Sequence, residues 1–517
     1  MEFNLLLWIT AFLPIIILLF LMSYIKMNSR QAALISLGTT ILLSIFIYEF
    51  QFNYLWIAIQ KGASLSLYVI LIIVGAVFLY NIVDIAGGFN SIKDFMKNID
   101  GDRAIQFILL SWAFSGFIQG VTGFGVPIAI VGALLIGTGY EPLKSITAVL
   151  VGHSWAISFG SMGSSFFALQ LVTDLEPIKL GITLALFFYI PIIATGIAVA
   201  HIYGGLKAVK DNLLYIFPVS LLIGSAQLAA AAGGFAHIGA LTGGIVGTVS
   251  LLLVLFKKTN LTFKDIKNIK TNQMPIGNAL LPYAVLIGSV LLFQIPLIKN
   301  LLPQLQIDFS FQGFTTNLGY QVSPEKSYSP IKLFSHPIFF LGLSSVIGLY
   351  IYIKNNYLSY QKFKNIITNT YNKAKSSVTT VLILMIMALI MNNSGMIYIF
   401  AKGMAEFSGN LFPLFSPFIG ILGAFLTGSN TSSNVLFGAF QLNTAGLLDL
   451  SPVMVSSTQS LGGSLGSAIA PAKILLGTSV VGIWNKEGQI IKRCIGYTLS
   501  IGLIVGLVSL IIHFIYI

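Results

Sequence analysis

The chain has 517 residues, of which 56% are hydrophobic and only 9% are charged. Soluble globular domains carry about 25% charged residues, so this composition excludes an ordinary soluble fold. The net charge of +12 does not require a nucleic-acid partner, because basic residues collect in the cytoplasmic loops of membrane proteins. The single cysteine, Cys494, excludes an intramolecular disulfide and a cysteine-rich metal site.

Apolar runs long enough to cross a bilayer recur along the chain, so the sequence predicts an all-α polytopic membrane protein with about twelve transmembrane helices and two re-entrant hairpins. The predicted spans are 4–25, 31–48, 64–84, 143–161, 180–203, 212–232, 235–256, 278–298, 334–353, 376–397, 452–484 and 495–515. Lys and Arg in short loops favour the cytoplasmic side. This rule places the lysine-rich loop after residue 256 inside, the segment 300–333 outside, and both termini outside the cell membrane.

Two further apolar runs are each interrupted by a short polar stretch, and neither half of either run is long enough to span a bilayer. Residues 104–138 are interrupted at 119–125, and residues 411–446 at 428–434. Irregular backbone at membrane depth is tolerated only where it is buried in protein or lines a cavity. We therefore expect one hairpin entering from the inside and a second entering from the outside, with a substrate at their tips.

The two hairpins lie in similar windows of the sequence. Lys61 and Lys373, and Pro142 and Pro452, are separated by 312 and 310 residues. The loop charges orient the first spans of the two windows in opposite directions, which is typical of the inverted repeats of secondary transporters. The predicted organisation is an N-terminal two-helix extension (1–60), a first inverted repeat with hairpin one (61–256), linking helices and loops (257–372), and a second inverted repeat with hairpin two (373–517).

Uncharged polar residues and glycines at the hairpin tips are the candidate substrate ligands. Hydroxyls, amides and the free N–H groups of a helix N-terminus can bind a carboxylate. The same oxygens can instead hold Na⁺, and a polar kink or close helix packing without a ligand is a third interpretation. The candidates are Gln119, Thr122, Gly123 and Gly125 in hairpin one, and Ser429, Asn430, Thr431, Ser432, Ser433 and Asn434 in hairpin two, with Ser429, Asn430 and Thr431 as the alternative Na⁺ ligands.

Two ionisable residues lie within predicted spans, where such residues are functional hypotheses by default. His153 is placed near the middle of its span and titrates near physiological pH, so we expect it to take part in proton coupling; a neutral histidine bonded between helices is the alternative. The span 452–484 is too long for one straight crossing, with Gly462, Gly463 and Pro471 as natural break points. Lys473 follows this break and can offset the charge of an anionic substrate or extend to the inner surface.

The hairpin regions resemble the two signatures of the lactate permease family. The first signature is Gln-Gly-Val-Thr-Gly-Phe-Gly-Val-Pro at 119–127, and the second is Gly-Ala-Phe-Leu-Thr-Gly-Ser-Asn-Thr-Ser-Ser-Asn at 423–434. The resemblance implies a symporter for lactate, glycolate and related 2-hydroxymonocarboxylates, usually coupled to H⁺. The triplet at 429–431 is also similar to the hairpin-tip motif of sodium–dicarboxylate symporters, so a Na⁺-coupled carboxylate symporter or a cation/H⁺ antiporter stays open.

The sequence departs from the family's pattern at positions that bear on coupling. The family usually has Glu, Asn, Asp and Lys where this chain has Gln119, His153, Asn430 and Ser467, while Lys473 appears six residues after the last of these. The usual carboxylates are therefore absent, and H⁺ and Na⁺ both stay open as coupling ions. The expected partners are a small carboxylate, the coupling ion and the lipid bilayer, with no nucleic acid and the oligomeric state open. No catalytic or phosphate-binding motif occurs, so we expect no enzymatic activity and no cofactor.

Overall fold

A computed structural model of the chain describes residues 4–98, 101–123, 125–259, 271–293, 295–483 and 485–516. Eleven helices in these ranges are long and apolar enough to cross a membrane, and twelve are if the bent pair Pro142–Ala156 and Gly160–Thr173 forms one span. The predicted fold class, an all-α polytopic membrane protein, is confirmed. Most of the lysine-rich loop after residue 256 lies outside the described residues.

All regular secondary structure in the described part of the first half of the chain is helical. Its elements are α1 (Leu5–Ser23), α2 (Ser29–Phe46), α3 (Phe52–Ile85), α4 (Gly88–Lys97), α5 (Arg103–Ile108), the π-helix η1 (Leu109–Phe114), α6 (Ser115–Val121), α7 (Val126–Gly137), α8 (Pro142–Gly152), η2 (Ser154–Ala156), α9 (Gly160–Thr173), α10 (Pro177–Ala232), η3 (Ala236–Ile238) and α11 (Gly239–Thr259). Gly204 and Gly205 interrupt α10 with non-helical backbone angles, so this element contains both spans predicted there.

The second half contains short strands as well as helices. Its elements are α13 (Ile276–Leu292), α14 (Pro296–Leu301), β1 (Gln306–Ile307), β2 (Phe314–Thr315), β3 (Gln321–Val322), β4 (Ile331–Lys332), α15 (Pro337–Lys354), η4 (Tyr360–Lys362), α16 (Phe363–Asn393), α17 (Met396–Ser408), η5 (Gly409–Leu411), α18 (Phe412–Thr427), α19 (Asn430–Leu447), α20 (Pro452–Gly466), α21 (Pro471–Val481) and α22 (Glu487–Tyr516). The four strands form two antiparallel pairs, β1–β4 and β2–β3, within the segment predicted as an outside loop.

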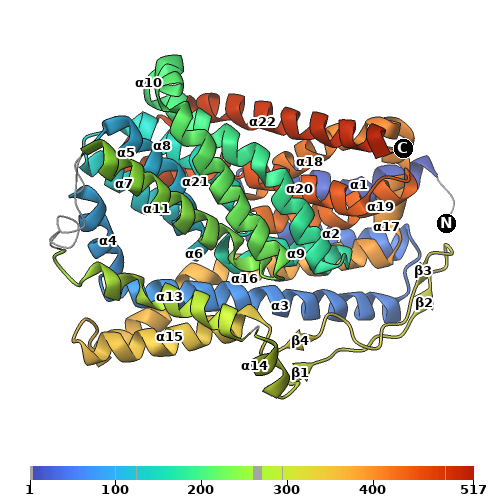
Figure 1. Ribbon diagram of the computed structural model, residues 1–517. Coiled ribbons are helices and arrows are strands. Elements are labelled where there is room, and N and C mark those ends of the chain that lie inside the picture. Colours follow the sequence, from blue (N-terminus) through green and yellow to red (C-terminus); the bar gives the residue numbers. More distant parts are fainter. Residues whose placement is uncertain are drawn as a thin grey trace.

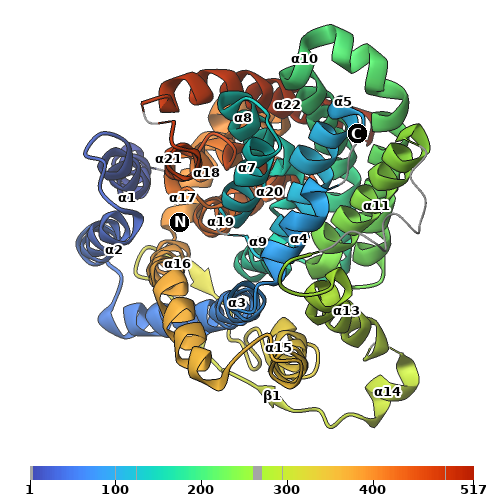
Figure 2. The ribbon, with the colours of Figure 1, turned by 90° about the vertical axis from the view of Figure 1, so that its left-hand side faces the viewer.

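The long helices run side by side, and both termini lie at the same end of them as β2 and β3, opposite α4 and α5 (Figure 1). Seen end-on, α1 and α2 lie on one side and α10 and α11 on the other, with α7, α9, α19 and α20 between them (Figure 2). Burial follows this order: 94% of the residues in the arm Arg103–Val121 are buried inside the protein, against 28% of the window Leu5–Met22. The first arm of hairpin one therefore occupies the interior of the bundle, and the N-terminal helices are peripheral.

A helix pair joined by a short turn is present at each predicted hairpin. The prediction that neither half can span a bilayer is wrong for the first arm of hairpin one, because Arg103–Val121 is long and apolar enough to cross a membrane. The arms of the first are α5–η1–α6 and α7, and those of the second are α18 and α19. The elements around them follow the same order in both windows: a long helix (α3 or α16), a short helix (α4 or α17), the hairpin and a broken helix. The sequence reasoning missed α4 and α17. Each begins after a glycine with a left-handed backbone, Gly87 (φ 89°) and Gly395 (φ 85°), which lets the chain turn sharply into the short helix.

The span predicted at 143–161 is not one straight helix, because the helix breaks there. The segments before and after the break are bent by 54°, and the second continues to Thr173. Ser161, Met162 and Gly163 all have positive φ angles, a conformation that interrupts the helical hydrogen-bond ladder.

The long span 452–484 is also broken, at Pro471 as predicted but not at the glycine pair. Helix α20 continues through Gly462 and Gly463 and ends at Gly466. At Gly462 a β-carbon would lie 1.9 Å from the carbonyl oxygen of Pro417. This glycine therefore permits close packing of α20 against α18 and does not end a helix.

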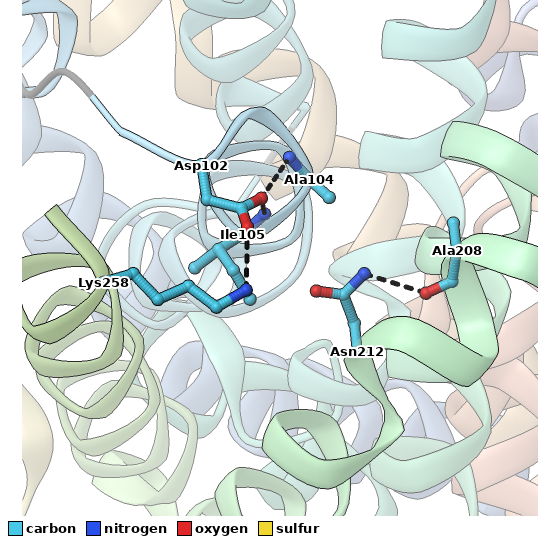
Figure 3. A network of polar contacts seen from close by, with 6 residues as sticks. All are labelled: Asp102, Ala104, Ile105, Ala208, Asn212 and Lys258. Carbon is cyan, nitrogen blue, oxygen red and sulfur yellow. Dashed lines mark hydrogen bonds and ion pairs between the residues drawn. The ribbon is translucent and has the colours of Figure 1, made fainter.

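An ion pair holds the start of hairpin one. Asp102 caps α5, accepting hydrogen bonds from the backbone amides of Ala104 and Ile105 at 2.9 and 3.1 Å and from Lys258 Nζ at 2.7 Å (Figure 3). Burial by itself raises the pKa of this carboxyl, but the hydrogen bonds from Lys258 and the amides outweigh burial and keep the pKa below its ordinary value. The end of α11 is thereby joined to the hairpin.

Candidate functional site

A cavity of about 300 Å³ lies where the two hairpin tips meet the breaks in the two broken helices. Hairpin one contributes two wall residues, hairpin two contributes six, and the remainder come from the breaks and from α2, α3 and α16. The principal wall residues are Gln119, Gly125, Ile157, Ser161, Ser164, Ser165, Thr427, Gly428, Ser429, Asn430, Thr431, Ser432, Ala472, Lys473, Leu476, Lys373, Ser376, Ser377 and Thr380.

The tip of hairpin two is a helix end followed directly by a helix start. Gly428 (φ 74°) ends α18 in a left-handed conformation, and Ser429 then caps α19, its hydroxyl accepting the amide of Ser432 at 3.3 Å. The first-turn N–H groups of a helix have no intrahelical partner, and the helix dipole favours an anion beside them. The tip therefore presents donor groups to the cavity.

The six candidates of hairpin two divide into two groups. Ser429, Asn430, Thr431 and Ser432 line the cavity, whereas Ser433 and Asn434 do not. The Ser433 hydroxyl donates to the carbonyl of Gly420 in α18. The Asn434 amide donates to the carbonyl of Ser165 and to the hydroxyl of Ser460. These two residues fix the hairpin to its neighbours in this conformation.

Two buried amide oxygens at the cavity lack donors. Asn430 Nδ2 donates to the Ser158 hydroxyl at 3.0 Å, but its Oδ1 has no hydrogen-bond partner in the described part of the chain. The same is true of Gln119 Oε1. A buried acceptor without a partner is destabilising, so both oxygens suit a ligand that brings a hydroxyl, a proton or a cation. The neighbouring Thr431 hydroxyl is hydrogen-bonded to Ser165 at 2.9 Å.

The glycines of hairpin one are required by backbone geometry. Gly123 and Gly125 have φ angles of 67° and 82°. A β-carbon at Gly123 would lie 1.7 Å from the Ser161 hydroxyl, and one at Gly125 would lie 2.5 Å from Leu476. The tip is therefore pressed between α9 and α21. Thr122 points away, its hydroxyl donating to the carbonyl of Ile118, and it does not line the cavity.

Lys473 supplies a positive charge to the cavity wall. It lies in the first turn of α21, and its ammonium donates to the hydroxyl of Ser467 in the break between α20 and α21. No carboxylate of the described residues lies within ion-pair distance of it. Lys473 is one of the residues that line the cavity, where a cation without a carboxylate partner favours a bound anion.

His153 lies behind the cavity, not at its wall. It is the first residue after α8 and is fully buried. One ring nitrogen, Nδ1, is bonded to the carbonyl of Val149, and Nε2 has no partner among the residues that the structure describes. The sequence placed this residue within a continuous helix, whereas it lies at the helix end.

Several wall residues were not among the sequence candidates. Ser161, Ser164 and Ser165 lie at the start of α9, in a run of small polar residues comparable to that of hairpin two. This run inside an apolar segment was the available signal. Lys373 of α16 was noted for its place in the second sequence window and not as a site residue; its ammonium donates to Asn81 and lies 3.7 Å from Asp84.

Comparison with known proteins agrees with this architecture. An L-lactate permease of Streptococcus iniae is 28% identical over 467 residues, covering 88% of this chain and 94% of that protein. The glycolate permease GlcA of Escherichia coli K12 is 25% identical, covering 98% of this chain and 96% of that protein. Among solved structures, the YdaH transporter of Alcanivorax borkumensis has a similar fold, with a TM-score of 0.50, 13% identity, and coverage of 89% of this chain and 88% of that one.

The resemblance of the two hairpin signatures extends to the whole sequence. A family model described as L-lactate permease matches residues 8–516, nearly the full length of the chain. The relatives are likewise aligned over most of their own lengths. The chain therefore belongs to the L-lactate permease family.

Proposed function

We propose that this protein is a secondary active transporter, a symporter that carries lactate, glycolate or a related 2-hydroxymonocarboxylate across the cell membrane. The observation that carries the proposal is the composition of the cavity between the hairpin tips. Its wall residues include a lysine without a carboxylate partner and two amides whose oxygens lack a hydrogen-bond donor among the described residues. A small hydroxy acid has both complementary groups, a carboxylate that accepts and a hydroxyl that donates. The names of the relatives support the same substrate class.

The substrate carboxylate lies, in this proposal, between Lys473 and the N-terminus of α19. Ser429 and Thr431 lie beside it as further hydroxyl groups. The 2-hydroxyl donates to Asn430 Oδ1 or Gln119 Oε1, each of which lacks a donor among the described residues. A cavity of about 300 Å³ is at the lower end of small-molecule sites, which suits a ligand of a few heavy atoms.

We propose H⁺ as the coupling ion, with Na⁺ as the alternative. None of the described wall residues is Asp or Glu, so the proton must be carried by another group, such as His153, or travel with the substrate. The alternative is favoured by one observation: Asn430 Oδ1 is an unpaired buried oxygen beside the hydroxyls of Ser429 and Thr431, and oxygen ligands suit a hard cation.

We propose an inverted-repeat organisation, with repeats at 61–256 and 373–517, a linking region at 257–372 and an N-terminal extension at 1–60. Alternating access follows from this organisation. The matching order of elements supports it, as do the equivalent glycines before α4 and α17. On a background without Cys494, single cysteines at Lys97 and Lys402 should be labelled from opposite faces of the membrane. Labelling from one face would rule out the inverted arrangement, and with it the outside placement of both termini.

The direct test is uptake into proteoliposomes. Purified protein is assayed with radiolabelled lactate, glycolate, a dicarboxylate and an unsubstituted monocarboxylate, with a pH gradient or a Na⁺ gradient applied in turn. We expect uptake of the 2-hydroxy acids driven by an inward H⁺ gradient, and its loss in Ser429→Ala and Thr431→Ala variants that still insert normally. Uptake that requires Na⁺ selects the alternative, and no carboxylate uptake under either gradient refutes the proposal.

A further inference from the structure

A second lysine, which does not line the cavity, is buried in the span α3, and its one ion pair among the described residues is with the strand-containing segment. Lys61 is 1% exposed, and its ammonium lies 2.9 Å from Glu325 Oε1. The same ammonium lies over the rings of Tyr328 and Phe311, at 5.1 and 5.7 Å from their centroids. The anion and both aromatic rings belong to the segment between β1 and β4, which packs against the start of α3 (Figure 1).

A chamber of about 210 Å³ lies beside this ion pair. Glu325, Tyr328 and Ser329 line it on the side of the segment, and residues of α9, α16 and α19, with Asp174 directly after α9, line it on the other. Lys61 lies behind Glu325 and is not itself a wall residue. The same helices line the central cavity at their opposite ends. In α9, Ser165 at the cavity and Leu171 at the chamber are separated by six residues, or about 9 Å of helix. The chamber therefore lies between the strand-containing segment and the far ends of helices that line the central cavity, on the side predicted to be outside.

The wall of the central cavity contains a comparable arrangement. Lys373, which lines the central cavity, lies 312 residues after Lys61 and occupies the corresponding helix of the second window. Its ammonium is 3.7 Å from a carboxylate oxygen of Asp84 and 4.3 Å from the ring centroid of Tyr80. A carboxylate and a tyrosine thus lie beside each of these two lysines.

We propose that Lys61 is the outer binding site for the carboxylate of the transported anion, and that Glu325 occupies this site while the strand-containing segment is closed. The proposal rests on the function proposed above. A buried cation in a span is costly without an anion, so Glu325 leaves Lys61 readily only when another carboxylate takes its place. External substrate therefore exchanges with Glu325, and the segment opens as the substrate enters the chamber.

The test compares influx with efflux in right-side-out membrane vesicles. Glu325→Gln removes the competing carboxylate but keeps a hydrogen-bonding side chain, so the KM for lactate or glycolate influx should fall. The decrease should be about two- to fivefold, the range that one partly exposed ion pair carries. The KM for efflux should not change, because that substrate enters from the other mouth. Asp308→Asn is the matched control: it removes one negative charge from an exposed position of the same segment, without contact with Lys61, and should leave both KM values unchanged.

A second variant keeps the proposal testable if Glu325→Gln does not fold. Lys61→Gln combined with Glu325→Gln removes both charges, leaves no unpaired buried ion, and should raise the influx KM while the efflux KM stays at the wild-type value. The proposal is overturned if Glu325→Gln behaves like Asp308→Asn, or if either variant shifts influx and efflux equally, as a purely structural contact would. A wild-type protein that transports no carboxylate refutes the function itself, whereas normal transport without these KM shifts refutes only the role of Lys61.

Discussion

Replacing Lys473 with methionine should separate substrate binding from stability. Methionine has a similar length and no charge, so the change removes the ammonium and its bond to Ser467 while keeping most of the side-chain volume. In the wild type the ammonium has no carboxylate partner in the described ranges, and an unpaired charge away from water is destabilising. We therefore expect the substrate-free variant to be as stable as the wild type or more stable.

Substrate affinity should fall in the same variant. A hydrogen bond to a charged group contributes about 1.5–3 kcal/mol, which corresponds to a loss of about 10- to 150-fold in affinity. The assay is the melting temperature of detergent-solubilised protein over a titration with lactate or glycolate, because a ligand that binds only the native state raises it by an amount that grows with the ratio of ligand concentration to Kd. Lys473→Arg, which retains the charge in a different geometry, should keep part of the affinity.

Two results would refute this reasoning. If Lys473→Met shows the wild-type shift in melting temperature at each concentration, Lys473 does not hold the anion. If the variant loses both its substrate response and several degrees of intrinsic stability, the lysine has a structural role that the geometry does not reveal. Ser467→Ala provides a graded comparison, since it leaves the ammonium in place and should weaken binding only by the about 0.5–1.5 kcal/mol of one ordinary hydrogen bond.

Three further predictions concern the hairpin and its surroundings. Gly123→Ala places a side chain on a left-handed backbone and also creates a clash. It should therefore destabilise the protein by more than the about 1–2 kcal/mol of the backbone strain alone. Gly137→Ala, where the added carbon has no neighbour within 4 Å, should be neutral or stabilising in the same thermal assay. Asp102→Asn should cost about 0.2–1 kcal/mol at neutral pH, because the ion pair is partly exposed. The folded-state pKa of Asp102 is depressed, so this contribution to stability is present above the ordinary aspartate pKa of about 4 and is lost as pH falls through the folded value. The difference in melting temperature between wild type and variant should therefore shrink on acidification, and a constant difference would contradict the role of the ion pair. His153→Asn should flatten the pH dependence of uptake if this histidine carries the coupled proton, and an unchanged rate and pH profile would exclude that role.

The class of protein and its two hairpins could be predicted from the sequence because lipid limits what a chain can do. Apolar runs of bilayer length must form helices, and a polar interruption within such a run must be buried or line a cavity. The stretch at 428–434 therefore already predicted a hairpin tip with its donors. Gly123 and Gly125 were also recognisable from the sequence. Only glycine adopts their backbone angles without strain.

The break between α8 and α9 depended on tertiary structure. Ser161 and Met162 have positive φ angles although neither is glycine, and a helix forced into this conformation needs support from its surroundings. Such support is visible at Gly163, where an added β-carbon would lie 2.7 Å from His237. No local propensity indicates this contact across more than 70 residues. The polar run of α9 was visible in the sequence, but the break that brings its serines to the cavity and leaves His153 at a helix end was not predictable.

Long-range pairing was decided in the same way. The sequence placed Lys473 after a helix break but left open whether its side chain extends to the membrane surface or to the substrate. The packing of α21 against α7 places this residue in the cavity wall. Lys61 and Glu325 are separated by 264 residues, and no spacing rule joins them. Bilayer thickness and backbone hydrogen bonding constrain each segment separately and can be read locally, whereas the partner of a charge depends on which segments the whole fold brings together.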